Sequence, residues 1–240
     1  MFSTSRLRIE LTELYINGVC RSVQSYTGEV AAGNIPKVLF DLRIVSYDKD
    51  GAIIGEEIYN NTLIYDAEDK DELGDIPKKT QYLIVYNTSN LKNIGSLKSA
   101  KGLRGLSIIF GYNLQDISPI EKLTDLEVVN LHDNELIDDI SVLKDLTKLK
   151  MLSISENKIT DISALKNLDE LRYLSIGDNE IEDISILSNL EKLEWINLSD
   201  NKIKDITPLS NLKKLTYLNI WRNEIEDYSP LDEVGIEYNK

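Results

Sequence analysis

Residues 146–165 have the sequence LTKLKMLSISENKITDISAL, and the spacing of apolar residues in this stretch decides the fold. The same frame, LxxLxxLxLxxNxIxDIxxL, begins again at Leu168, Leu190 and Leu212, each time 22 residues further on. Toward the N-terminus it continues at spacings of 23 residues, so that the first apolar residue of LxL recurs at Leu83, Leu106, Val129, Leu152, Leu174, Ile196 and Leu218. Such repetition predicts a solenoid of seven stacked turns that share one apolar core.

Each position of the frame has a physical reason. In LxL, apolar and polar residues alternate as in a strand that is buried on one face, so Leu152 and Ile154 are predicted to face the core. Ile159 and Ile162 are predicted to close that core from the far side. The asparagine that follows the strand is predicted to bond backbone groups that the sharp turn leaves unpaired. Its copies in successive turns are Asn134, Asn157, Asn179, Asn201 and Asn223.

The remaining part of the frame predicts a short helical turn on the convex side. Ser163, Ser185 and Thr207 are suited to cap this turn, and Pro119, Pro208 and Pro230 suit its first position. The aspartates that precede them recur because the turn recurs. In the first two turns, around Ser89 and Gly111, the asparagine is missing or displaced, which predicts distorted turns there.

The stretch from Asn157 to Leu231, with NKITDISALKNL and NKIKDITPLSNLKKL, resembles the internalin-type leucine-rich repeats of bacterial surface proteins. Eukaryotic phosphatase-regulating proteins have a similar 22-residue repeat, but the run DISxLxxL favours the bacterial group. The resemblance covers about residues 80–234 and implies an α/β leucine-rich-repeat solenoid, with a parallel concave sheet and short 3-10 or helical convex turns. It also implies binding of another protein on the concave face. The sequence contains neither the helical cap before the repeats nor the immunoglobulin-like domain after them that occur in that family.

Residues 1–79 lack the repeat and alternate apolar with polar residues, as in Leu7, Ile9, Leu11 and again in Val38, Phe40, Leu42, Ile44. This pattern predicts a small antiparallel β unit, with an immunoglobulin-like sandwich as its candidate architecture, ahead of a solenoid in residues 80–240. The segment VLFDLRIVSYDKDGAIIG (38–55) resembles one hairpin of FxLYD-type β-sandwich domains. Asp66 to Asp75 are predicted to form the linker into the first repeat.

The DKDG stretch has two interpretations. Asp48, Asp50 and Gly51 resemble part of a calcium loop, but the further oxygen ligands that such a loop needs are not present in register. We therefore expect a hairpin turn, in which Asp-Gly supplies a positive φ.

Composition excludes several classes of function. The net charge is −14, which disfavours binding to a nucleic-acid backbone or to anionic lipid. No apolar run is long enough to insert into a membrane, and the first six residues lack the apolar core of a signal peptide. We expect a bacterial surface or secreted protein whose signal peptide lies outside this sequence, with a cytoplasmic location as the alternative. Neither Cys20, the single cysteine, nor the sequence as a whole decides the compartment or the oligomeric state.

The inventory of reactive residues predicts a protein that is not an enzyme and that holds no metal or cofactor. His132 and Cys20 are the single histidine and cysteine and lie in different predicted domains. The motifs HExxH, GxGxxG and the Walker loop are absent, and a zinc site lacks ligands other than carboxylates. Paired acids such as Asp138 and Asp139 are expected to be solvated turn residues.

The strand frame also predicts which residues face outward on the concave sheet. Successive first positions form a row of large side chains over a floor of serine, asparagine and glycine, and both tryptophans lie on this face. Because exposed aromatic residues are enriched at binding sites, we predict a partner-binding surface made of Met151, Tyr173, Trp195, Asn197, Tyr217, Asn219 and Trp221.

Three alternatives to this binding surface stay open. The aromatic rings can pack on one another along the row, residues 235–240 can fold back over them, or the row can bind glycans instead of protein. An intracellular adaptor or phosphatase-regulator type of protein is a further alternative with the same fold. If the protein-binding hypothesis holds, both indoles should point away from the core and be accessible to a fluorescence quencher.

Overall fold

The computed structural model describes residues 4–6, 14–16, 19–21, 29–31, 40–47, 53–232, 234, 236 and 238–239. Its main feature is a ten-stranded sheet whose strands follow one another in chain order. They are β5 (Phe40–Tyr47), β6 (Ile53–Asp66), β7 (Tyr82–Tyr86), β8 (Gly105–Ile108), β9 (Val128–Asn130), β10 (Met151–Ser153), β11 (Tyr173–Ser175), β12 (Trp195–Asn197), β13 (Tyr217–Asn219) and β14 (Tyr238–Asn239). Neighbouring strands from β6 to β14 are parallel, whereas β5 and β6 are antiparallel.

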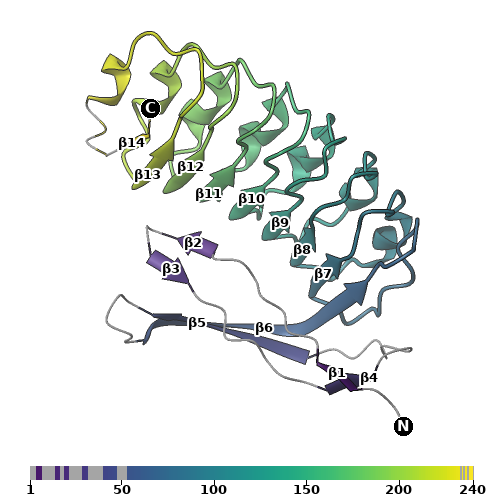
Figure 1. Ribbon diagram of the computed structural model, residues 1–240. Coiled ribbons are helices and arrows are strands. Elements are labelled where there is room, and N and C mark those ends of the chain that lie inside the picture. Colours follow the sequence, from purple (N-terminus) through teal and green to yellow (C-terminus); the bar gives the residue numbers. More distant parts are fainter. Residues whose placement is uncertain are drawn as a thin grey trace.

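Short 3-10 helices lie on the other side of the stack. They are η1 (Gly95–Ser99), η2 (Ser118–Ile120), η3 (Ser141–Asp145), η4 (Ser163–Asn167), η5 (Ser185–Asn189), η6 (Thr207–Leu209) and η7 (Ser229–Leu231). Figure 1 shows the stack curving so that the strands line its inner side, here called the concave face, and the 3-10 helices its outer, convex side. The predicted solenoid with a parallel sheet and short convex turns is confirmed.

One continuous core runs through the turns, from Leu63 to Leu231. Leu152 and Ile154 are fully buried, and Ile159 and Ile162 enclose them from the convex side with at most 1% of their surface exposed. Burial of apolar surface stabilises by roughly 25 cal/mol per Å², so a core shared by all turns makes each turn depend on its neighbours.

The N-terminal part contributes further antiparallel pairs. β1 (Thr4–Arg6) pairs with β4 (Glu29–Ala31), and β2 (Leu14–Ile16) pairs with β3 (Val19–Arg21). β5 and β6 form the predicted hairpin, with Ser46 opposite Gly55. The turn residues Asp48, Asp50 and Gly51 lie outside the described residues, so the choice between hairpin turn and calcium loop stays a prediction.

Strand β6 takes part in both the hairpin and the solenoid. Its second half pairs in parallel with β7, with Thr62 opposite Tyr82. Leu63, Leu73 and Ile76 belong to the shared core. The prediction that Asp66 to Asp75 form a linker was therefore wrong, because this segment makes a turn of the solenoid itself. Because β6 pairs both with β5 of the hairpin and with β7 of the solenoid, these pairings do not place a domain boundary, and the division of the chain at residue 79 stays a prediction.

The asparagines after the strands act as predicted. Asn179 is 8% exposed, and its Nδ2 donates to the carbonyl oxygens of Ile154, Ile176 and Gly177 at 3.1–3.2 Å. Its Oδ1 accepts the backbone N–H of Ile159 at 3.0 Å. One side chain therefore satisfies backbone groups of two successive turns, and Asn201 and Asn223 repeat the arrangement.

The hydrogen-bonding pattern changes where the repeat is one residue longer. Asn134 and Asn157 keep their donated bonds, but the Oδ1 atoms of both have no hydrogen-bond partner among the described residues. In the turn between them Glu135 adds a second left-handed residue, with φ 54°, and the Leu136 N–H donates to the Asn134 carbonyl at 2.6 Å instead. The 23-residue spacing thus leaves a less regular turn.

The helical turns are capped by the aspartates and not by the predicted hydroxyl residues. The 3-10 helices begin at Ser163, Ser185 and Thr207 and have no side-chain capping bond from their N-cap residues. Instead, the Asp183 Oδ1 accepts the backbone N–H of Ser185 at 2.7 Å. The serines lie one position too late to cap, because the helix starts at the serine itself. The prolines lie in the first turns of η2, η6 and η7, at the second position of each helix and not at the predicted first position.

The repeated aspartate bonds predict that acid weakens the fold. Bonds from the backbone N–H or the hydroxyl two residues on lower the pKa of these carboxyls; they are Asp116, Asp139, Asp183, Asp205 and Asp227. A pKa lower in the folded than in the unfolded chain stabilises the protein above the unfolded value of about 4, and this stability is lost as the pH falls through the folded pKa. We expect the melting temperature to drop below about pH 4.

The matched control replaces Asp139, Asp183, Asp205 and Asp227 by asparagine, which keeps an oxygen acceptor but removes the titration. Melting curves at neutral and acidic pH should show a smaller acid-induced drop for this variant than for the wild type. Equal drops would mean that the turn aspartates do not cause the acid sensitivity.

Candidate functional site

The concave face presents outward-facing residues in aligned rows. Met151, Tyr173, Trp195 and Tyr217 lie opposite one another in the parallel register of β10 to β13. Two residues further along these strands, Asn197 and Asn219 lie opposite each other in the same register and form the next row. Six of the seven predicted partner-binding residues therefore lie in these strands on one face, and Trp221 follows β13 two residues after Asn219. They differ mainly in how much of each side chain is exposed.

Three aromatic residues form a continuous stack, here called the aromatic stack (Tyr173, Trp195 and Tyr217). The ring centroids of Tyr173 and Trp195 are 4.2 Å apart and those of Trp195 and Tyr217 are 4.7 Å apart, with interplanar angles of 10° and 5°. In-register parallel strands about 4.8 Å apart place successive side chains directly on one another, which suits stacked rings. Burial raises the pKa of the Tyr173 hydroxyl to about 12.

The stack corrects one expectation about the tryptophans. Trp195 is only 8% exposed, because a tyrosine ring covers each of its faces, so the prediction that both indoles are accessible was wrong for Trp195. It nevertheless lies outside the apolar core of the solenoid. For Trp195, the structure therefore shows the alternative in which the aromatic rings pack on one another along the row.

Trp221 differs from Trp195 and is 44% exposed. The guanidinium of Arg222 lies 3.9 Å from the centroid of its ring, and the Arg222 Nη1 is 3.2 Å from the Asp200 Oδ1. The indole is therefore held in place at the C-terminal end of the concave face while much of its surface remains in contact with water.

The polar floor beside the stack is partly bonded to the backbone. The Oδ1 atoms of Asn197 and Asn219 accept the N–H groups of Ser199 and Trp221, each at 3.2 Å. Asn197, Asn219 and Met151 are half-buried. These bonds fix the side chains before any partner arrives, which lowers the entropy that binding would cost.

A row of charged residues, with both signs present, borders the concave face just before the strands, and the repeat pattern did not predict it. The Arg104 Nε and the Lys150 Nζ bond opposite oxygens of Glu127 at 2.7 and 2.8 Å, and the Arg172 Nη1 bonds the Glu194 Oε1 at 2.7 Å. Burial raises the pKa of Glu127, but the bonds with Lys150 and Arg104 outweigh it and leave the pKa below its usual value. A charged residue directly before each strand from β8 to β12 was the signal that could have revealed this row.

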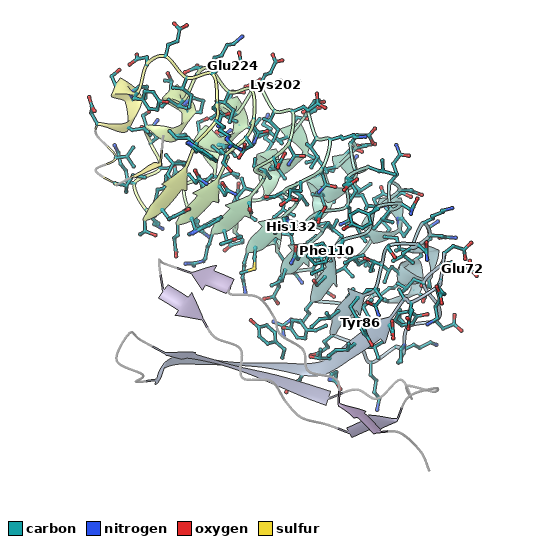
Figure 2. The ribbon with its side chains drawn as sticks, in the orientation of Figure 1. Glu72, Tyr86, Phe110, His132, Lys202 and Glu224 are labelled. Atoms are coloured by element: carbon teal, nitrogen blue, oxygen red, sulfur yellow. The ribbon has the colours of Figure 1, made fainter. Side chains whose placement is uncertain are left out.

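A second group of exposed aromatic residues lies near the N-terminal end of the solenoid. Phe110 is 49% and Tyr112 46% exposed, in the turn after β8. The Phe110 ring meets the edge of His132 with a centroid distance of 6.2 Å, and Figure 2 shows these two residues side by side. The repeat pattern predicted a distorted turn here, but it did not predict that these aromatic residues form a surface.

Comparison with known proteins agrees with this geometry. The family described as "Leucine Rich repeats (2 copies)" matches residues 147–189 and 191–233. The crystal structure of internalin C2 from Listeria monocytogenes is similar with a TM-score of 0.61 and 31% identity, over 74% of this chain and 80% of that one. The chain belongs to the internalin-like leucine-rich-repeat proteins.

A second internalin supports the same assignment. Internalin F from Listeria monocytogenes is similar to this internalin-like chain with a TM-score of 0.56 and 25% identity, over 74% of this chain and 66% of that one. A search of curated protein sequences gave no significant match. The internalin-like repeats and neighbours indicate a protein-interaction module, and folds of this kind typically serve as scaffolds without catalytic activity.

The described part of the internalin-like chain contains no group of three or more histidine, cysteine, aspartate or glutamate side chains placed to hold a metal ion. His132 lies 3.5 Å from a carboxylate oxygen of Glu156 through its Nε2. Within the described residues, no helix has the length and apolar character needed to cross a membrane.

Proposed function

We propose that this internalin-like chain binds another protein through the concave face, within a bacterial surface or secreted protein. The observation that carries the proposal is the exposed Trp221, four residues after the last tyrosine of the aromatic stack. Tryptophan is enriched among the residues that dominate binding energy, and such residues usually lie beside well-packed neighbours. Trp221 is the anchor, and Tyr173, Tyr217, Asn197 and Asn219 form the surface around it.

The arrangement of the rings favours a protein partner over a glycan. A sugar ring stacks on an exposed aromatic face, but both faces of Trp195 are covered by tyrosines. One face of Trp221 is covered by the Arg222 guanidinium. The central ring of the aromatic stack therefore offers no face on which a sugar ring could stack, which favours the side chains and backbone of a protein.

Replacing Trp221 by alanine should weaken capture of the partner by about 2 kcal/mol or more while the melting temperature changes little. The physical reason is that the ring contributes to binding but is too exposed to contribute much to folding. The measurement compares pull-down by wild type and Trp221→Ala, followed by titration of the recovered protein.

The control is Lys166→Ala in η4 on the convex side, which should bind like the wild type. A glycan array run in parallel tests the alternative partner class. Wild-type binding by Trp221→Ala, or glycan binding that Trp221→Ala abolishes, would contradict the proposal. Whether the parent protein is displayed on the surface is tested separately, by antibody labelling of intact cells.

A further inference from the structure

Phe110 has a backbone conformation that its side chain does not favour. Its φ is 59°, in the left-handed region, where a bulky residue without a stabilising contact is an outlier. The ring is not buried in compensation, because 49% of the residue is exposed and its aromatic contact is an edge contact with His132. The conformation is imposed by the turn: the Phe110 N–H donates to the His132 carbonyl at 3.3 Å.

The same position in the other turns is occupied by polar residues. All are left-handed with φ between 52° and 56°, and they are Asn87, Asp133, Glu156, Asp178, Asp200 and Arg222. Asparagine and aspartate adopt this conformation more readily than other residues, because their short side chains bond locally. Phenylalanine therefore does not stabilise this turn better than asparagine or aspartate would. Its exposed ring is better explained by contact with a partner than by folding.

Neighbouring side chains hold the backbone of this turn in place. A Cβ at position 111 would collide with the Asn134 Oδ1, so Gly111 allows the close approach of that amide. The Asn113 Nδ2 bonds the Ser89 carbonyl at 2.6 Å, and the Thr88 hydroxyl bonds the Ile109 carbonyl. Phe110 and Tyr112 thus stand on a pre-ordered turn, and an ordered aromatic anchor loses little entropy on binding.

Carboxylates flank this turn on both sides along the solenoid. In the turn after it, Asp133 and Glu135 are at least partly exposed, and Glu156 is exposed in the turn after that one. Two turns before it, the segment from Asp66 to Asp75 contains six acidic residues and one lysine. The turn between them, residues 87–93, contains Lys92 and no carboxylate, and Asn87 of that turn donates to the Asp66 Oδ1. An exposed apolar anchor between acidic borders is complementary to a positively charged segment that carries an apolar side chain.

We propose that Phe110 and Tyr112 form a second interaction surface, which binds a cationic segment of a partner protein through an apolar side chain. The aromatic rings provide the contact area, while the acidic residues on either side attract lysine and arginine and orient the segment. This surface follows β8, four strands away from Trp195 in β12 and five strands away from Trp221, which follows β13. It does not depend on the function proposed for the concave face.

The decisive variant is Phe110→Asn. Asparagine tolerates the left-handed conformation, so the variant should unfold at the same or a higher denaturant concentration than the wild type. The probe is a 14-residue peptide of lysine and leucine, which the variant should bind about tenfold or more weakly. The matched control is Trp221→Asn, which removes an exposed aromatic residue elsewhere and should bind this peptide like the wild type.

Two more arms test the charge and the partner. A 14-residue peptide of glutamate and leucine should not bind, and added salt should weaken the lysine peptide. The proposal is overturned if Phe110→Asn binds the lysine peptide normally, if Trp221→Asn weakens it equally, or if the glutamate peptide binds as well. Loss of stability in Phe110→Asn would also overturn it, as would concentration-dependent self-association of the wild type that Phe110→Asn abolishes.

Discussion

Replacing Asn179 by alanine is expected to lower the free energy of unfolding by about 3 kcal/mol. The variant removes three donated bonds, to Ile154, Ile176 and Gly177, and the bond accepted from Ile159. Because Asn179 is 8% exposed, water cannot freely replace its amide, and each backbone group that stays buried without a partner costs energy. Chemical denaturation of wild type and variant measures the loss.

Asn157→Ala is the matched control for this prediction. Asn157 has the same burial and the same three donated bonds, but its Oδ1 accepts none. Its replacement should therefore cost about 1 kcal/mol less than that of Asn179. An unchanged midpoint for Asn179→Ala would mean that solvent satisfies the turn, and equal losses in both variants would mean that the accepted bond contributes nothing.

Replacing Trp195 by alanine is expected to destabilise the protein by about 3 kcal/mol, although the residue lies outside the apolar core. The substitution opens a gap between Tyr173 and Tyr217, which each lose a stacked neighbour. Trp221→Ala should cost far less, because 44% of Trp221 is already exposed. Thermal or chemical denaturation of the two variants provides the comparison.

Fluorescence gives an independent measurement of the same difference. Acrylamide should quench the emission of Trp195→Phe, in which Trp221 is the remaining indole, more strongly than that of Trp221→Phe. Equal quenching of the two variants would mean that the aromatic stack opens in solution. In that case the loss of stability on replacing Trp195 should also be small.

The repeat could be predicted from the sequence because its physics is local and periodic. Alternation at LxL, an asparagine three positions after the second apolar residue and a spacing of 22 or 23 residues together specify strand, turn and stacking direction. The register that these positions imply also predicted that Met151, Tyr173, Trp195 and Tyr217 lie in one row. The paired strands show the same row. The helix caps were misassigned by two residues, since a helix start cannot be located to one residue from a pattern.

What the sequence by itself determined is therefore the solenoid, its core and the outward-facing rows, since each follows from spacing along the chain. The tertiary structure alone decided how exposed each outward residue is, because exposure depends on what the neighbouring turn brings alongside. Trp195 is covered because tyrosines occupy the same position in both adjacent turns, whereas Phe110 stays exposed with edge contact to His132. In the same way, β6 joins the parallel sheet through pairing with β7, a contact between segments that no repeat pattern linked.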